Sequence, residues 1–294
     1  MRSLAGRILW DQWAVYREAL KTGWEWLLLP KGFASFVADC PLKLAVYIHD
    51  LIPLRCAERW PGSMSRRKLL YLKRSYAGTL KRADVVFTNT EYTRKDILRW
   101  AAEQKIDCPP VHVAGYGFSA PSGPAVRKDD QILVLIRPDR HKRPDLCLEY
   151  MRRWIRESGY GGRILCVGCF AEDVGVGQEP GWEWLGRIPA GLCTEQMRRS
   201  RIVVHFSEYE GFGMPPVESV LSGTCPVYSA IPVAVEVMQD CGCGFRNNRY
   251  ADFTSAMQNA LAATADQLLD WQQRLIDRHS WKNVTEKILS VVNE

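Results

Sequence analysis

Short apolar runs alternate with longer segments of helical periodicity along most of the chain. Several runs are almost continuously hydrophobic, which is typical of parallel strands covered on both faces. The pattern predicts strands at Leu44–Ile48, Val85–Asn89, Val111–Ala114, Ile132–Ile136, Arg163–Val167, Ile202–Phe206 and Pro226–Ser229. It predicts helices at Ser65–Leu80, at Glu91–Ala102 with Thr90 as cap, and at Asp145–Ser158 opened by Pro144. This alternation favours an α/β fold with parallel sheets.

One segment between these elements predicts a domain boundary. Residues 119–124 are small and rich in Pro and Gly, and a charged turn, Arg127–Asp130, follows them. The chain of 294 residues is long enough for two modest domains. We therefore expect two α/β domains, at residues 1–120 and 125–278.

Composition indicates a folded protein, with 47% hydrophobic and 24% charged residues. No run of about 20 apolar residues predicts a membrane span. Asp11, Arg17 and Glu18 interrupt the start, so we expect no signal peptide and a cytoplasmic location. The ten cysteines are expected to be reduced. The pairs Cys166/Cys169 and Cys241/Cys243 leave a zinc site as the alternative to buried free thiols, which we favour.

The net charge of +6 is unevenly distributed. Residues 1–100 contain 18 Lys and Arg against 9 Asp and Glu, whereas the rest contains 21 against 24. This asymmetry suggests an anionic partner for the first part, such as a membrane surface. Four early Trp residues and the basic clusters between residues 66 and 82 favour peripheral membrane binding, with a solvated basic face as the alternative. No recognition motif supports a nucleic-acid partner.

The strongest chemical motif is Glu210-Gly-Phe-Gly-Met-Pro-Pro-Val-Glu218, which follows a predicted strand. Its glycines permit a tight turn and close backbone approach, and its Pro pair can start a helix. A helix that begins there directs backbone N–H groups and a positive dipole toward an anion such as phosphate. The two carboxylates can then point into the crevice at the strand ends and accept sugar hydroxyls. Isolated surface charges are the alternative interpretation.

Two further groups follow predicted strands. The loop Arg137-Pro-Asp-Arg-His-Lys142-Arg-Pro follows the first strand of the second domain, and its basic residues can neutralise a diphosphate. A solvated charged turn is the alternative. His49, with Asp50, follows the strand Leu44–Ile48 and can hydrogen-bond a substrate or serve a structural role.

These motifs together resemble the glycosyltransferases of family 4, which have the GT-B fold of two Rossmann-like domains facing a cleft. The resemblance rests on the two glutamates of the Gly-Phe-Gly loop, the spacing of Arg137 and Lys142, and the His49-Asp50 pair. The segment Ala83–Thr93 and the tail His279-Ser-Trp-Lys are also similar to that family. Residues 279–294 would then form a last helix that crosses back to the first domain. The resemblance covers roughly residue 40 to the end.

The resemblance implies a retaining transfer of a hexose from a nucleotide-diphosphate sugar, without a metal or other cofactor. Arg137 and Lys142 would bind the diphosphate, and Glu218 the ribose. Glu210, Gly211, Phe212, Gly213 and Met214 would hold the transferred sugar. His49 would lie near the anomeric carbon, so the catalytic set would be His49, Arg137, Lys142 and Glu210. The expected acceptor is a saccharide or lipid-linked saccharide in cell-surface polysaccharide or lipopolysaccharide assembly.

One departure from the family leaves alternatives open. Family members open with a strand, a Gly-rich loop and a helix, whereas residues 1–40 show an amphipathic stretch with Trp10, Trp13, Trp24 and Trp26. We therefore expect a shortened N-terminal domain. A nucleotide-sugar epimerase or hydrolase on a similar fold, and a non-catalytic partner chain, remain as alternatives to an active transferase.

Overall fold

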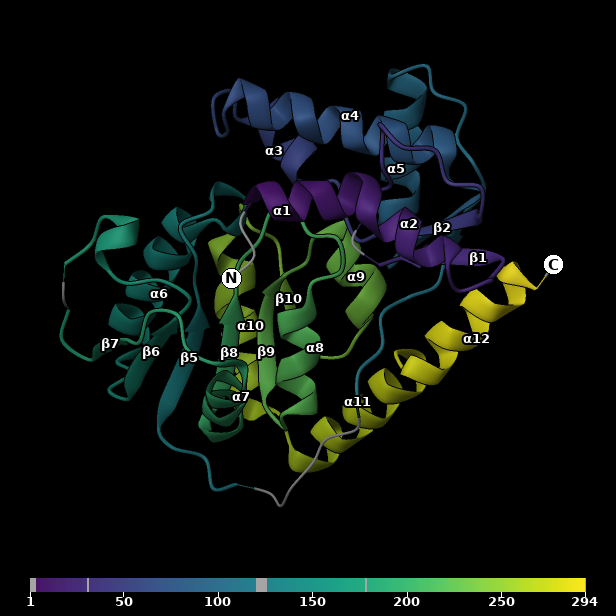
Figure 1. Ribbon diagram of the computed structural model, residues 1–294. Helices are drawn as coiled ribbons and strands as arrows, with labels where there is room; N and C mark the ends of the chain where they lie inside the picture. The colour runs from purple at the N-terminus through teal and green to yellow at the C-terminus, as the bar shows by residue number, and fades with distance from the viewer. Residues whose placement is uncertain (1–3, 31, 120–125, 178, 294) are drawn as a thin grey trace. The chain divides into compact units, whose positions relative to one another are not determined.

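The computed structural model describes residues 4–30, 32–119, 126–177 and 179–293. The predicted linker falls mostly on residues 120–125, which lie outside the described residues. The chain forms two compact units (Figure 1). Unit 1 comprises Met1–Gly117 with Trp281–Glu294, and unit 2 comprises Phe118–Ser280.

Unit 1 contains a parallel sheet of four strands in the order β1-β2-β3-β4. The strands are β1 (Trp26–Leu29), β2 (Lys43–Ile48), β3 (Val85–Thr88) and β4 (Val111–Val113). The helices are α1 (Leu4–Leu9), a π-helical turn (Trp10–Ala14), α2 (Val15–Leu20), α3 (Ile52–Arg59), α4 (Arg66–Arg82), α5 (Glu91–Glu103) and α12 (Trp281–Val292).

The structure confirms most of the predicted elements of this unit and corrects one region. The side chain of Thr90 caps α5 by accepting from the amide of Thr93, and Ser65 caps α4 by accepting from Lys68. The sequence analysis predicted no strand within residues 1–40, and that prediction is wrong. Strand β1 pairs in parallel with β2, with Trp26 opposite Lys43 and Leu29 opposite Val46. Propensity could not separate this short Leu-rich segment from the amphipathic stretch before it.

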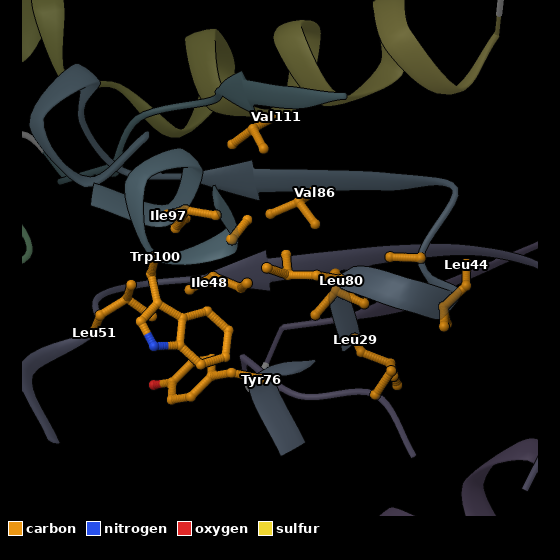
Figure 2. Close-up of a cluster of buried hydrophobic side chains, with 14 of the residues drawn as sticks. Leu29, Leu44, Ile48, Leu51, Tyr76, Leu80, Val86, Ile97, Trp100 and Val111 are labelled. Carbon is orange, nitrogen blue, oxygen red and sulfur yellow. The ribbon is translucent and has the colours of Figure 1, made fainter. Parts of the chain in front are cut away.

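Both faces of the unit 1 sheet are covered. One face packs with α4 and α5 around Leu44, Val46, Ile48, Tyr76 and Trp100, all of them buried (Figure 2). The opposite face presents alternate residues of the same strands, as strand geometry requires. Those residues are Ala45, Tyr47, Val85 and Phe87, and they pack against Val284, Ile288, Val291 and Val292 of α12.

Unit 2 contains a parallel sheet of six strands in the order β10-β9-β8-β5-β6-β7. The strands are β5 (Gln131–Leu135), β6 (Arg163–Val167), β7 (Trp182–Trp184), β8 (Ile202–His205), β9 (Cys225–Ser229) and β10 (Cys243–Phe245). The chain starts in the middle at β5, moves outward through β6 and β7, and then returns to the other side of β5 with β8. The strand order therefore reverses between β5 and β8, which is where open α/β sheets bind ligands.

The helices of unit 2 connect these strands. They are α6 (Pro144–Ser158), α7 (Ala190–Arg199), α8 (Met214–Leu221), α9 (Pro232–Met238), α10 (Tyr250–Ala262) and α11 (Ala265–Arg278), with 3-10 turns at Arg140–Lys142 and Glu172–Val174. Pro144 occupies the first turn of α6 as predicted. The outer strands β7 and β10 were not predicted.

Candidate functional site

The first loop at the reversal point follows β5 and carries the basic residues. It closes with the 3-10 turn Arg140–Lys142, and Arg143 then takes a left-handed conformation (φ 47°) before Pro144 starts α6. Gly168, just after β6, packs against the start of this loop. A Cβ at Gly168 would lie 2.3 Å from the carbonyl oxygen of Ile136, and its φ of 122° also favours glycine. The neighbouring strand thus fixes the path of the loop.

The second loop follows β8 and carries Glu210. It ends at Gly213, whose left-handed backbone (φ 83°) caps α8. Pro215 and Pro216 then occupy the first turn of that helix. Because proline has no N–H group, the first turn of α8 offers fewer amide donors to an anion than an ordinary helix start. If an anion binds here, more of its charge would have to be met by the basic side chains of the first loop than the sequence motif suggested.

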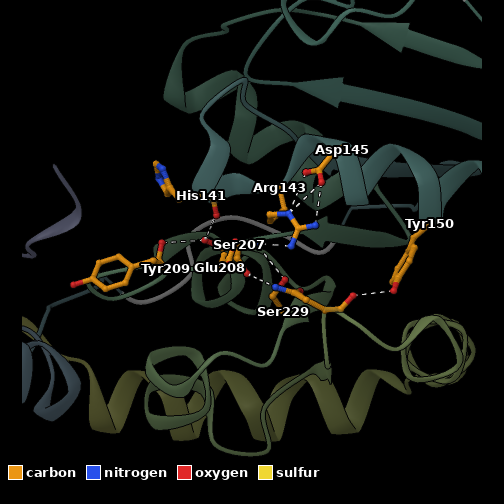
Figure 3. Close-up of polar contacts among 9 residues, drawn as sticks. His141, Arg143, Asp145, Tyr150, Ser207, Glu208, Tyr209 and Ser229 are labelled. Atoms are coloured by element: carbon orange, nitrogen blue, oxygen red, sulfur yellow. Dashed lines mark hydrogen bonds and ion pairs between the residues drawn. The ribbon is translucent and has the colours of Figure 1, made fainter. Parts of the chain in front are cut away.

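Backbone and side-chain bonds join these two loops (Figure 3). The amide of Glu208 donates to the carbonyl of His141 at 2.7 Å, and Ser207 Oγ lies 3.2 Å from the same carbonyl. The guanidinium of Arg143 lies 3.8 Å from the Glu208 carboxylate. Since the loops are anchored to each other, side chains on one are held in a fixed position relative to those on the other.

The central contact of the site is the ion pair between Lys142 Nζ and Glu210 Oε1. Only 16% of the Lys142 side chain and 9% of the Glu210 side chain are exposed. Burial alone would raise the pKa of Glu210, but Lys142, His205 and Ser207 outweigh it and lower that pKa below its ordinary value. Glu210 is therefore an ionised acceptor at neutral pH.

Two histidines lie beside this pair and are neutral. His205 Nε2 lies 3.6 Å from Glu210 Oε1 at the end of β8. Burial, and next the charge of Lys142, lower the pKa of His205 to about 4. The same two causes lower the pKa of His141. The pair at the centre of the cluster is one carboxylate and one ammonium, which neutralise each other and are groups that bind hydroxyls and anions respectively.

Arg137 and Glu218 are placed differently from this pair. The side chain of Arg137 is 53% exposed, and its Nε lies 3.0 Å from Asp139 Oδ2. Glu218 is half-buried in α8, and burial raises its pKa. The pKa values of Glu210 and Glu218 are thus displaced in opposite directions, which separates the two carboxylates of the motif chemically.

Glu218 also lines a cavity of about 1000 Å³. Other lining residues are Asp130, Arg201 and Cys225, which lie at the starts of β5, β8 and β9, so this cavity extends to the amino edge of the sheet. Neither Lys142 nor Glu210 lines it. We place the site at the carboxyl edge nevertheless, because the paired charges and the strand reversal lie there. That Glu218 faces the same crevice as Glu210 stays a prediction.

His49 belongs to unit 1, at the carboxyl end of β2. Its Nε2 lies 2.9 Å from the carbonyl of Pro30, to which it must donate, and its Nδ1 lies 3.4 Å from Asn89 Oδ1. The Asn89 amide donates in turn to the His49 carbonyl at 3.0 Å. The hydrogen bond to the Pro30 carbonyl therefore orients the imidazole. Its proposed place near the anomeric carbon stays a prediction.

Sequence reasoning missed His205 and Ser207. Both lie in or directly after an apolar strand, where a polar residue is easily taken as part of the core. Ser207 is buried, its amide donates to Ser229 Oγ at 3.0 Å, and its carbonyl accepts from Asn247 at 2.8 Å. The available signal was a histidine and a serine in the five residues before Glu210.

The described residues contain neither a metal-binding cluster nor a membrane-spanning helix. No group of three or more His, Cys, Asp or Glu side chains in this part of the chain is arranged to hold a metal. None of its helices has the length and hydropathy that crossing a bilayer requires. That the reaction needs no metal stays a prediction.

Comparison with known sequences identifies relatives of part of the chain. A mannosyltransferase of Xanthomonas oryzae pv. oryzae (strain PXO99A), GDP-mannose:cellobiosyl-diphosphopolyprenol alpha-mannosyltransferase, is 32% identical over 98 residues, or 32% of this chain and 26% of that protein. The serotype-specific mannosyltransferase WbdA of Escherichia coli is 29% identical over 106 residues, or 36% of this chain and 13% of WbdA. The matched segments thus span about a quarter or less of these relatives.

Solved structures extend the likeness over most of the chain. Sucrose-phosphate synthase from Thermosynechococcus elongatus matches 99% of this chain and 77% of its own, with a TM-score of 0.69 and 15% identity. TarM matches 86% of this chain and 51% of its own, with a TM-score of 0.65 and 18% identity. These neighbours have the GT-B fold, so the predicted fold class of parallel α/β sheets is confirmed.

Residues 121–288, more than half of the chain, match the model of the family described as glycosyl transferases group 1. This match includes both loops of the site and the ion pair that joins them. The chain belongs to the group 1 glycosyl transferases.

Proposed function

We propose that this protein transfers a hexose, with retention, from a nucleotide-diphosphate sugar to a saccharide or lipid-linked saccharide acceptor. The observation that carries the proposal is the buried Lys142–Glu210 ion pair at the strand reversal. A donor would separate the pair, because its diphosphate attracts the ammonium and its sugar hydroxyls donate to the carboxylate. One ligand with an anionic part and a hydroxylated part suits both groups.

The donor class fits the same two charges. Lys142, with Arg137 on the same loop, would neutralise the negative charge that develops on the departing diphosphate. In a front-face displacement the anomeric carbon–oxygen bond to the diphosphate breaks, and the acceptor oxygen bonds to that carbon on the same face. The acceptor proton passes to the departing diphosphate. Since two relatives are named as mannosyltransferases, GDP-mannose is the first donor to test.

An acceptor built on a lipid diphosphate, as the name of the Xanthomonas relative states for that protein, would place the reaction in polysaccharide assembly at the cytoplasmic face of a membrane. Neither a metal nor another cofactor is needed if Lys142 and Arg137 supply the positive charge.

Calorimetric titration with GDP, UDP and their sugars tests donor binding. We expect micromolar binding of one nucleoside diphosphate, weakened at least about tenfold by Lys142→Ala, since a charged hydrogen bond contributes about 1.5–3 kcal/mol. Lys287→Ala, an exposed lysine of α12, is the matched control and should bind as the wild type. Absence of any nucleotide binding would refute the proposal.

Product analysis by mass spectrometry separates the transferase from its alternatives. Incubation with donor and a panel of lipid-linked and free saccharides should give a hexosylated acceptor, and NMR of the product should show the anomeric configuration of the donor. Consumption of donor to free sugar or to an epimer at the same rate without acceptor would favour a hydrolase or epimerase. Glu210→Ala should lower turnover more than donor binding, with exposed Glu149→Ala as control.

A further inference from the structure

Helix α4 of unit 1 presents a strongly basic outer face. Seven of its 17 residues are Lys or Arg and none is acidic. Five of these are exposed, namely Arg66, Arg67, Lys68, Arg74 and Lys81, and none of the five forms an ion pair with another residue of the described chain. The opposite side of the helix is buried in the unit 1 core. Within the described residues, the outer face therefore carries positive charge that no ion pair compensates.

Large apolar side chains are exposed on the elements before this helix. Within α1, α2 and the residues up to β1 they are Ile8, Leu9, Trp13, Leu20, Trp24 and Leu28, with Trp24 72% and Trp13 45% exposed. Leu70 of α4 itself is also exposed. Single exposed apolar residues are ordinary, but a group on consecutive elements marks an interaction site.

Residues 33–38 contact both the apolar and the basic elements. The amide of Ser35 donates to the hydroxyl of Tyr16 in α2 at 2.5 Å, and Ala34 donates to Thr79 Oγ1 in α4 at 2.7 Å. The guanidinium of Arg82 donates to the Ser35 carbonyl at 2.7 Å. Figure 1 shows α1 and α2 in purple and α4 in blue, all within this unit. We call the exposed residues of α4 and of residues 8–28 the basic–apolar face.

We propose that the basic–apolar face docks on an anionic lipid bilayer. Lys and Arg side chains attract anionic headgroups, while Trp and Leu side chains enter the boundary between headgroups and acyl chains. A nucleic acid would use the charges alone and would leave the apolar side chains in water, so the combination favours a bilayer. Binding of this kind needs no spanning helix. It deepens the proposed function, on which its consequence rests, by bringing unit 1 to a lipid-linked acceptor.

Cosedimentation with vesicles tests this docking. Vesicles of phosphatidylcholine with about one third phosphatidylglycerol should bind the full chain at least tenfold better than phosphatidylcholine alone, and salt should weaken the binding. Each basic residue near the surface contributes about fivefold in partitioning, so the triple change Arg67→Glu, Lys68→Glu and Arg74→Glu should reduce it by more than about 100-fold. The double change Trp13→Ala and Trp24→Ala should reduce it about tenfold and abolish the blue shift of tryptophan fluorescence on binding.

A matched control reverses three exposed arginines of unit 2, namely Arg156, Arg187 and Arg249. This variant has the same net charge as the α4 triple variant and should bind vesicles as the wild type. Circular dichroism and nucleotide binding establish that each variant is folded. Lys142→Ala should weaken nucleotide binding at least about tenfold but keep vesicle binding, so failure of the proposed reaction is distinguishable from failure of docking.

Several results would overturn the inference. Equal binding to neutral and anionic vesicles, wild-type binding by the α4 triple variant, or equal loss in the unit 2 control would each exclude the basic–apolar face. Binding to a DNA duplex without vesicle binding would assign the charges to a nucleic acid instead.

Discussion

Replacing Lys142 with methionine isolates the energy of the central ion pair. Methionine keeps much of the aliphatic volume but leaves the Glu210 carboxylate buried without its cation. Both side chains are mostly desolvated, so the pair differs from surface pairs, which contribute at most about 1 kcal/mol. Removing one partner of a buried pair typically costs about 3–5 kcal/mol.

Protonation of Glu210 sets an upper limit on this cost. Each pH unit corresponds to about 1.4 kcal/mol, so keeping a carboxyl with an ordinary pKa of 4.5 protonated at pH 7 costs about 3 kcal/mol. We therefore expect Lys142→Met to lose at most about 3 kcal/mol at pH 7 and about 1 kcal/mol or less at pH 5. Proton uptake by His205, whose pKa Lys142 also lowers, keeps the cost under this limit.

The sign of the pH dependence separates this cause from simple loss of packing. In the wild type the lowered pKa of Glu210 gives stability that is present above pH 4.5 and is lost as the pH falls through the folded value. In the variant, burial would raise that pKa, so stability is lost as the pH rises above 4.5. The difference between the two proteins must therefore grow with pH.

Urea unfolding of both proteins between pH 5 and pH 7 measures this difference. The double variant Lys142→Met with Glu210→Gln should recover more than half of the stability lost at pH 7, because no buried charge remains. Lys287→Met, at an exposed position, should match the wild type. A destabilisation that is equal at pH 5 and pH 7 would refute the electrostatic reasoning.

Three further changes probe the surroundings of the pair. Gly168→Ala should lower Tm by several degrees in a thermal melt and weaken nucleotide binding in a titration, because its Cβ would meet the Ile136 carbonyl. The control Gly161→Ala, whose Cβ would meet open space, should change neither. In the wild type, stability should fall below pH 6.5, because the unfolded chain binds a proton at His205 whereas the native state, with a pKa of about 4, does not. His205→Gln should reduce this pH dependence. Urea unfolding at pH 6.5 and 4.5 should show a loss of about 2 kcal/mol in the wild type alone. Buried Phe212→Ala should cost about 3–5 kcal/mol and lower kcat, and Phe212→Leu should recover most of both; equal kcat in all three proteins would exclude a positioning role.

Hydrophobic patterning was sufficient to predict the central strands of the sheets but not their outer strands. Runs such as Ile202–His205 are apolar because both faces of a central parallel strand are buried. The outer strands β7 and β10 have three residues each and include polar or exposed positions, so neither period nor composition separates them from loops. Their pairing with β6 and β9 is a tertiary effect that local sequence does not encode.

The sequence predicted where the two loops of the site lie, but not the contacts between them. Strand-to-loop position predicted that Lys142 and Glu210 lie at one edge of the sheet. The backbone carbonyl of His141 accepts a hydrogen bond from the Glu208 amide. This contact depends on the left-handed conformation of Arg143. No residue pattern predicts a left-handed conformation at Arg143, because arginine rarely adopts it.

The placement of α12 has a consequence for the order in which the protein forms on the ribosome. The four strands of unit 1 are synthesised before unit 2, yet the sheet face formed by Tyr47 and Phe87 stays uncovered until Trp281–Val292 leaves the ribosome. At about 5–20 residues per second, synthesis of residues 118–280 takes roughly 10–30 s, and unit 2 can close during that delay. A stop codon just before Trp281 would therefore leave unit 2 complete but leave unit 1 without the helix that covers Tyr47 and Phe87.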